Sequence, residues 1–552
     1  MKHFFTAFAV LFFFGIHAQA PLMWTGAAQG EGDSYEDAFG ITVDNDNNLY
    51  VTGYFASDSV TFGNFTLHNA GMSDVFIVKY DPQLNPVWAV SIGGSNDDYG
   101  MAITCDSSDR IIVVGNYTSN SMVVGNDTLN NLSSSTPDMF IARIDANGNF
   151  IWAKSEGGPN WDNCAGVDMN TSNGDIYVSA AYYLDTMVIG NDTLLNHGGY
   201  DMVLMKFDIN GNYLWARNAG GNFNDLANAV SYDRFNNCVI ISGGFASDSL
   251  KFPVDTLLNP AMGLPETFVV KYDPNGNCIW ARRSGAGDND HSVAVDVDML
   301  GQIYVGGHYH STSFIFANDT LVNQGQGDVY LLVYDANGNP LWAKSAGGPE
   351  QDFGYSVFVN NAGVIFYTGM FTSLNITFGT YTFNNLNINE DMFLVAYDAS
   401  GNEINSLTTT GLGSDYINSV VATNTDVYMA GSFGTPSIQM GTTLTNTDQS
   451  GNTSDPFVAG ATVPLSVQPL ANNGWTWLVY PNPSNGIFSF TSSVEGSAEV
   501  KVYNAMGEQI ISRSENDVKN FSIDLSDEPV GNYFVQISTA EGIFSKQVVV
   551  SR

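Results

Sequence analysis

Short runs of apolar residues, separated by turn residues, recur along most of the chain. In a run such as DVFIVKYD, which starts at Asp74, apolar side chains occupy consecutive positions instead of alternating with polar ones. This pattern predicts β-strands that are covered on both faces. Asn-Gly turns such as DANGN, which starts at Asp145, follow several runs and favour tight hairpins, because Asn and Gly accept positive φ at little cost.

The runs belong to one unit that is written seven times. An apolar run that ends in small and aromatic residues starts at Tyr50, Ile112, Tyr177, Ile240, Tyr304, Phe366 and Tyr428. Relatives of DVFIVKYD start at Asp74, Asp138, Asp201, Glu266, Asp328, Asp391 and Asp455. A third landmark is a tryptophan, at Trp24, Trp88, Trp152, Trp215, Trp280 and Trp342, so that successive copies lie 62 to 65 residues apart.

Each unit holds four strand-like runs, which predicts an all-β, seven-bladed β-propeller over residues 21–463. The seventh unit lacks its fourth run, and the run at Trp24 supplies it, so we expect the N-terminal strand to close the last blade. Surplus residues between the second and third runs, as at Val60 and Met122, predict an extra hairpin that projects from each blade. Residues 22–463 resemble the bacterial β-propeller repeat of secreted proteins.

The repeat stops near Val463, and residues 464–474 form a predicted linker with Pro and Asn. Residues 475–552 hold about seven short alternating runs, which predict a small immunoglobulin-like β-sandwich. The segments VYPNPSNGIFSF from Val479, VKVYNAMGEQI from Val500, PVGNYFVQI from Pro529 and KQVVV from Lys546 resemble the type IX secretion C-terminal sorting domain. The residues that carry this resemblance are Tyr480, Pro481, Asn482, Pro483, Gly486, Tyr503, Gly507, Gly531, Tyr533 and Lys546.

The resemblance implies a Bacteroidota-type cell, the type IX secretion machinery as a partner, and cargo that is released or anchored to the outer surface of the outer membrane. Residues 1–20, with Lys2 and His3 before an apolar run and small residues at Ala18 and Ala20, predict a signal peptide. No later apolar run is longer, so we expect no membrane span in the mature protein.

A formal charge of -38 argues against nucleic acid as a partner, because the chain would repel a phosphate backbone. The four cysteines are too sparse for a disulfide framework, and we expect thiols, with pairing left open.

Catalytic motifs with a serine elbow, HExxH zinc ligands or a P-loop are missing from the sequence, so no catalytic residue is assigned. His308 and His310, with His291 and Asp290 upstream, could hold a metal, although ordinary packing explains them as well. Asp44, Asp46 and Asn48 have a spacing that suits calcium, but turn geometry explains this spacing too, so no cofactor is expected and calcium stays open.

Asp-Thr-Leu triplets start at Asp127, Asp192, Asp255 and Asp319 and are either hairpin tips or acceptors of O-glycosylation.

Taken together, the sequence favours a secreted or cell-surface, non-catalytic propeller that binds a glycan or protein. Two alternatives stay open: an extracellular hydrolase or lyase with a site at one end of the channel, and a structural component of a surface layer or biofilm.

Overall fold

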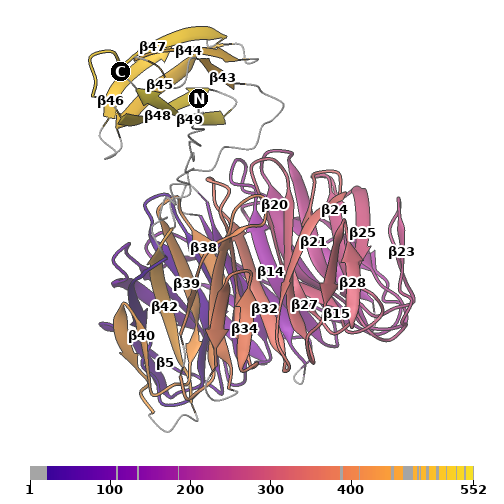
Figure 1. Ribbon diagram of the computed structural model, residues 1–552. Coiled ribbons are helices and arrows are strands. Elements are labelled where there is room, and N and C mark those ends of the chain that lie inside the picture. Colours follow the sequence, from indigo (N-terminus) through magenta and orange to yellow (C-terminus); the bar gives the residue numbers. More distant parts are fainter. Residues whose placement is uncertain are drawn as a thin grey trace, which may run out of the picture.

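The computed structural model describes residues 22–463 apart from 107–109, 134–135, 185, 386–388, 410 and 449–452, together with most of 477–550. In this second stretch, residues 481–483, 485, 493–495, 505–508, 517–518, 530 and 540–541 are outside the described set. The described residues form strands and turns without any helix, and therefore without a helix that could cross a membrane (Figure 1). The predicted signal peptide lies outside them.

Seven antiparallel sheets of four strands form the predicted ring of blades. Blade 1 contains β2 (Glu36–Val43), β3 (Leu49–Phe55), β6 (Asp74–Tyr80) and β7 (Pro86–Ile92), and blade 2 contains β8 (Asp98–Cys105), β9 (Ile111–Tyr117), β12 (Asp138–Ile144) and β13 (Phe150–Glu156). Blade 3 contains β14 (Asp162–Met169), β15 (Ile176–Tyr183), β18 (Tyr200–Phe207) and β19 (Tyr213–Ala219), and blade 4 contains β20 (Asp225–Asp233), β21 (Cys238–Phe245), β24 (Glu266–Tyr272) and β25 (Cys278–Ser284). Blade 5 contains β26 (His291–Val297), β27 (Ile303–Tyr309), β30 (Asp328–Tyr334) and β31 (Pro340–Ala346), and blade 6 contains β32 (Asp352–Val359), β33 (Ile365–Phe371), β36 (Asp391–Tyr397) and β37 (Glu403–Thr408).

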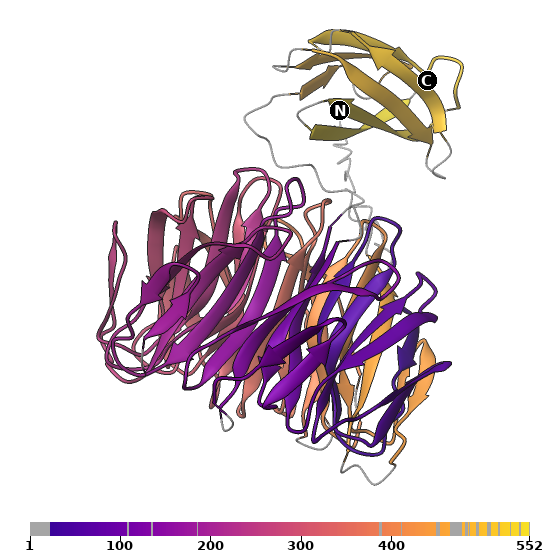
Figure 2. The same cartoon turned by 180° about the vertical axis from the view of Figure 1, so that it is seen from behind.

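Blade 7 joins the two ends of the ring, as the missing fourth run predicted. Its strands are β38 (Asp415–Ala422), β39 (Asp426–Phe433), β42 (Asp455–Thr462) and the N-terminal strand β1 (Trp24–Gln29). Trp24 pairs with Ala461 and Gln29 pairs with Phe457, and the orange strands of blade 7 lie beside the indigo strands of blade 1 (Figure 2). This pairing covers the edge of β42 that would otherwise be open.

The surplus residues of each unit form a two-stranded hairpin, seven in all among the described residues. The hairpins are β4 (Ser59–Phe62) with β5 (Phe65–His68), β10 (Ser121–Val124) with β11 (Asp127–Asn130), β16 (Met187–Ile189) with β17 (Asp192–Leu194), β22 (Ser249–Lys251) with β23 (Thr256–Leu258), β28 (Ser313–Phe316) with β29 (Asp319–Val322), β34 (Asn375–Phe378) with β35 (Tyr381–Asn384), and β40 (Ser437–Met440) with β41 (Thr442–Thr445).

These hairpins lie against the outermost strand of their own blade instead of projecting freely. The first residue of the Asp-Thr-Leu triplet makes the connection: Asp127 accepts a hydrogen bond from the backbone N–H of Ala153 at 2.8 Å, and Asp319 does the same for Ala343. The following threonines, including Thr128 and Thr320, are exposed. The aspartate of the triplet therefore shields the edge of the blade.

Glycine pairs and buried acids join neighbouring blades. Asp98, at the start of β8, accepts hydrogen bonds from Gly94 N at 2.7 Å and Ser119 Oγ at 2.8 Å. A Cβ on Gly93 would lie 2.1 Å from Asp74 Oδ1, and one on Gly94 would lie 2.6 Å from Ser119 Oγ. Both positions of the repeated Gly-Gly pair therefore need glycine because side chains fill the space beside them.

The C-terminal domain consists of two sheets. One contains β43 (Trp477–Tyr480), β44 (Ile487–Ser492) and β47 (Asn520–Asp524), and the other contains β45 (Ala498–Asn504), β46 (Gln509–Glu515), β48 (Gly531–Thr539) and β49 (Gly542–Val550). Phe488 and Phe490 of the first sheet share one buried cluster with Val500, Val535 and Val548 of the second, so the sheets pack face to face. The seven strands match the predicted number, and the immunoglobulin-like classification stays a prediction.

Candidate functional site

The innermost strands of the seven blades enclose a central channel. We call the end where these strands begin the upper mouth and the end where they finish the lower cavity. The upper part of the channel has a volume of about 200 Å³ and the lower cavity about 510 Å³. An apolar collar separates them, formed by Ile41, Ile103, Val167, Val230, Val295 and Val357.

One residue from each blade follows the collar and lines the lower cavity. In blade order these residues are Thr42, Thr104, Asp168, Ser231, Asp296, Phe358 and Val421. They occupy the same register on the innermost strands, because every one of these strands carries a β-bulge at the same place. The repeat therefore gives every blade the same backbone at this position of the channel, while the type of side chain differs from blade to blade.

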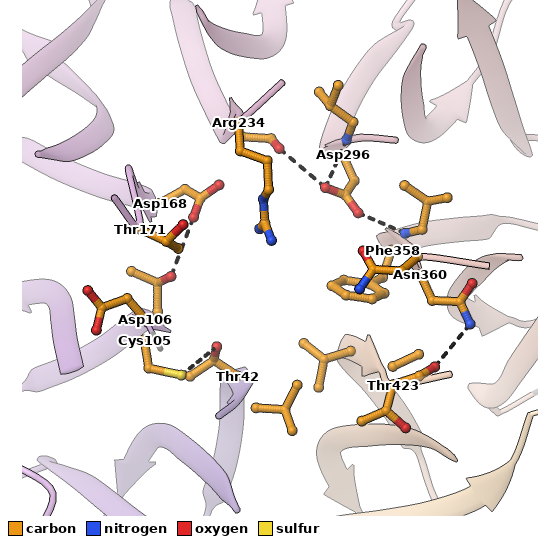
Figure 3. A pocket seen from close by; sticks show the side chains of 18 of the residues that line it. Thr42, Cys105, Asp106, Asp168, Thr171, Arg234, Asp296, Phe358, Asn360 and Thr423 are labelled. Atoms are coloured by element: carbon orange, nitrogen blue, oxygen red, sulfur yellow. Dashed lines mark hydrogen bonds between the residues drawn. The ribbon is translucent and has the colours of Figure 1, made fainter. Parts of the chain in front are cut away.

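Asp168 and Asp296 tie neighbouring blades together around the cavity (Figure 3). Asp168 accepts hydrogen bonds from Thr104 Oγ1 at 3.4 Å and from the backbone N–H of Tyr232 at 2.7 Å. Asp296 accepts hydrogen bonds from Ser231 Oγ at 3.2 Å and from the N–H of Val359 at 2.7 Å. Burial raises the pKa of both carboxyls, that of Asp296 to about 7.

Arg234 follows the end of β20 and extends its guanidinium into the lower cavity (Figure 3). Its charge counteracts the rise in the pKa of Asp168 and of Asp296, so it lies near both carboxyls. Phe358 places its ring in the same cavity.

Aromatic side chains from four consecutive blades surround the upper mouth. We call Phe39, Tyr54, Tyr99, Phe353, Tyr355 and Tyr416 the aromatic wall. Each is partly exposed, and Phe39 and Tyr355 line the upper part of the channel. The ring centroids of Tyr54 and Tyr99 lie 4.9 Å apart, edge to face, and those of Phe39 and Tyr54 lie 5.6 Å apart.

A polar pair lies beside the aromatic wall. Asn418 Nδ2 donates a hydrogen bond to Asp37 Oδ1 at 2.8 Å, and the charge of Asp37 acts on Tyr54, Tyr355 and Tyr416. Burial raises the pKa of Asp37 to about 7, against the hydrogen bonds from Ser432 and Asn418. Sequence analysis missed this wall, although Tyr99, Phe353 and Tyr416 are each the second residue of an innermost strand, and Phe39 and Tyr355 are each the fourth.

The three histidines of blade 5 lie close together, and the ring centroids of His308 and His310 are 5.8 Å apart. The ring centroids of His291 and His308 lie 4.3 Å apart, and His308 also contacts Phe353 at 4.5 Å. Burial lowers the pKa of His291 to about 4 and that of His308 further. Asp290 accepts hydrogen bonds from Ala286 N and from Ser311 at 3.0 Å and 2.5 Å. These contacts describe packing, and the described residues contain no group of three His, Cys, Asp or Glu arranged to hold a metal.

The calcium candidates form a turn. Asp44 accepts hydrogen bonds from Asp46 N at 2.9 Å and Asn48 N at 2.8 Å, and Lys79 Nζ lies 4.0 Å from the same carboxylate. Asp145 in the Asn-Gly turn accepts the same pair of backbone bonds from Asn147 and Asn149. Turn geometry therefore explains the spacing of Asp44, Asp46 and Asn48.

The four cysteines are thiols, three of them buried.

The tryptophan landmarks join one blade to the next. Trp88, Trp152, Trp215 and Trp280 each donate a hydrogen bond from Nε1 to a carbonyl in the Asn-Gly turn of the following blade. Trp342 lies against the equivalent turn at Gly401, and Trp24 belongs to the strand that closes the ring.

The sorting-domain landmarks lie partly within the described residues. Tyr480 ends β43, Tyr503 lies in β45, Lys546 lies in β49, and Gly531 opens β48. Tyr533 is buried and donates from its hydroxyl to the carbonyl of Pro529 at 2.8 Å. Gly486 has a φ of 128°, and a Cβ there would lie 2.4 Å from Ser526. Pro481, Asn482, Pro483 and Gly507 lie outside the described residues.

Two curated proteins are similar in sequence to parts of this chain. A match of 415 residues at 24% identity links 61% of this chain to 30% of the uncharacterized WD repeat-containing protein L264 of Acanthamoeba polyphaga mimivirus. A match of 175 residues at 29% identity links 30% of this chain to 18% of the regulatory protein FlaEY of Caulobacter vibrioides. The chain thus spans less than a third of the length of these curated relatives.

Among solved structures, the WD40 domain of Neurospora crassa Pan2 has a TM-score of 0.41 and 10% identity, over 81% of this chain and 97% of that domain. A likeness of this size carries no argument about function.

Residues 478–551 match the secretion system C-terminal sorting domain. This match covers the segment that carried the resemblance in the sequence. The protein is therefore a seven-bladed β-propeller with a type IX secretion C-terminal sorting domain, exported to the cell surface or the extracellular space.

Proposed function

We propose that the exported propeller is a non-catalytic carbohydrate-binding protein that holds a glycan on the aromatic wall of its upper mouth. The observation that carries the proposal is the wall itself: six partly exposed aromatic side chains lie at one end of the blades, and Phe39 and Tyr355 line the channel there. Aromatic rings offer flat apolar surfaces at low cost in side-chain entropy, which suits the C–H faces of pyranose rings.

Polar groups beside the wall support this ligand class. Asp37 and the Oδ1 of Asn418 can accept hydrogen bonds from sugar hydroxyls, whereas Asn418 Nδ2 already donates to Asp37 and to the carbonyl of Ala38. An apolar surface with a few fixed polar groups is the usual composition of a small-molecule site.

The hydrolase or lyase alternative would draw on carboxyls of the channel. Asp168 and Asp296 already accept three hydrogen bonds each from their own and neighbouring blades, which favours a role in joining blades. A structural role in a surface layer or biofilm would not explain why six partly exposed aromatic rings gather at one mouth.

Titration calorimetry of the mature protein with a panel of neutral oligosaccharides tests the proposal. We expect at least one oligosaccharide to bind, and expect Tyr54→Ala and Tyr355→Ala to weaken it about tenfold or more. Tyr35→Ala is the matched control, because Tyr35 is 55% exposed and lies outside the wall. Release of reducing sugar during the titration would instead support the hydrolase.

A further inference from the structure

The lower cavity carries features that a joint between blades does not need. All seven blades line it, and its volume of about 510 Å³ lies within the range of about 300–1,000 Å³ that is typical of sites for small organic ligands. It opens at the end of the channel opposite to the aromatic wall, so the two sites are separated by the apolar collar.

Arg234 is the cation that points into this cavity (Figure 3). A guanidinium has five N–H donors and needs acceptors. Among the described residues, its guanidinium makes no hydrogen bond and no ion pair. Other arginines near this end of the channel are engaged: Arg110 pairs with Asp106, and Arg143 Nη1 donates to the carbonyl of Ile209.

The carboxyls that line the cavity are already engaged as well. Asp44 and Asp298 accept backbone hydrogen bonds within their turns, and Asp106 pairs with Arg110. Asp168 and Asp296 accept bonds from three blades. These carboxyls therefore present few vacant lone pairs to a ligand, while the donors of Arg234 are vacant.

The ring of Phe358 supplies the complementary surface. It faces the same cavity from blade 6, whereas Arg234 enters from blade 4 (Figure 3). Thr42, Thr423 and Asn424 add hydroxyl and amide groups to the lining of the same cavity. A ligand that fits these groups carries a carboxylate, a flat apolar ring face and several hydroxyls.

We propose that the lower cavity is a second binding site, which takes a carboxylate-bearing sugar such as a hexuronate, with its carboxylate on Arg234 and a ring face on Phe358. Arginine recognises carboxylates through two parallel hydrogen bonds, a geometry that lysine cannot reproduce. The site is independent of the aromatic wall, because no residue of the wall lines the lower cavity.

Ligand-observed NMR and calorimetry with galacturonate and galactose on the mature protein test the proposal, since the two sugars differ only at C6. We expect galacturonate to bind at least about tenfold more tightly than galactose. Arg234→Gln should abolish the preference for galacturonate, and Arg234→Lys should retain part of it. Phe358→Leu should weaken galacturonate binding. Arg234 is exposed, so the two Arg234 changes should leave the melting temperature unchanged.

Tyr355→Ala is the control for the other mouth and should leave galacturonate binding unchanged. Equal binding of both sugars, absence of galacturonate binding, or unchanged binding by Arg234→Gln would overturn the proposal. Loss of galacturonate binding on Tyr355→Ala would place the acid on the aromatic wall and would also overturn it. Failure of the galacturonate experiment would not affect the proposal for the aromatic wall, which the panel of neutral oligosaccharides tests separately.

Discussion

Trp88 in blade 1 donates a hydrogen bond from its indole Nε1 to the carbonyl oxygen of Ala146 in blade 2, at 2.9 Å. The two residues are 58 positions apart, and the indole lies over Gly148 of the same turn. Three further blades repeat this bond with their own tryptophan. The repeat in the sequence therefore corresponds to a repeated contact between blades, in which these four tryptophans bind the Asn-Gly turn of the next unit.

Trp88→Phe should destabilise the propeller by about 1–2 kcal/mol, since it removes the indole N–H and leaves the Ala146 carbonyl without this donor. Trp161→Phe is the control, because Trp161 is 48% exposed, and its effect should stay within about 0.5 kcal/mol. Urea unfolding of the two variants measures the difference. Equal midpoints would show that the indole bond contributes nothing.

Gly148→Ala should destabilise the protein by more than the backbone strain alone would. Gly148 has a φ of 85°, and a Cβ there would lie 3.0 Å from the ring of Trp88. Gly363 has a φ of 74° with nothing within 4 Å of its Cβ position, so Gly363→Ala measures the strain by itself, about 1 kcal/mol. Thermal melts should show a larger loss for Gly148→Ala, and an equal loss would disprove the contact.

The blades should melt at higher temperature in mild acid than at pH 8. Each blade has two buried acids. Glu36, Asp98, Asp162, Asp225, Asp290, Asp352 and Asp415 lie at or just before the start of the innermost strands, and Asp74, Asp138, Asp201, Glu266, Asp328, Asp391 and Asp455 lie on the third strands. Burial raises the pKa of Asp98 to about 6 and that of Glu36 and Asp162 to about 7.

A carboxyl whose pKa is raised on folding stabilises the protein below its unfolded pKa and loses this contribution as pH rises through the folded value. The melting temperature should therefore fall between pH 5 and pH 8. Asp328→Asn should reduce this slope, because burial raises the pKa of Asp328 to about 6. Asp335→Asn should leave the slope unchanged, because hydrogen bonds from Asn339 outweigh slight burial and lower the pKa of Asp335. A melting temperature that rises across this range would contradict the prediction.

Removal of residues 475–552 should leave the propeller in the periplasm, because the sorting domain directs passage across the outer membrane. Protease accessibility on intact cells and cell fractionation measure the location. The same residues fused to a periplasmic reporter should bring the reporter to the cell surface. Display of the truncated propeller on the surface would contradict the assignment.

The fold was open to prediction because its signals are repeated. Seven copies of one apolar run indicate seven blades, and the Asn-Gly turns indicate hairpins within them. The Trp24 segment supplies the strand that the seventh copy lacks. The hairpins were predicted as projections, and the bond from Asp127 to the outermost strand shows why they fold back. The purpose of the Gly-Gly pair became visible only with Asp74 and Ser119 in place.

The candidate sites were not predicted because only some blades carry the residues that form them. Tyr54 and Tyr355 are 301 positions apart and come to the same mouth only because the ring closes between blades 7 and 1. Arg234 stands in a turn where other blades carry different residues, and its importance comes from pointing into the cavity (Figure 3). The histidines were singled out in the sequence as metal candidates, and the structure packs His308 against His291 and Phe353.

The structure of the mature protein with the tightest-binding neutral oligosaccharide from the panel tests the central claim most directly. The account predicts a pyranose ring stacked on Tyr355 or Tyr54 at the upper mouth, with a sugar hydroxyl bonded to Asp37 or Asn418. A sugar bound elsewhere on the propeller, with the aromatic wall empty, would contradict it.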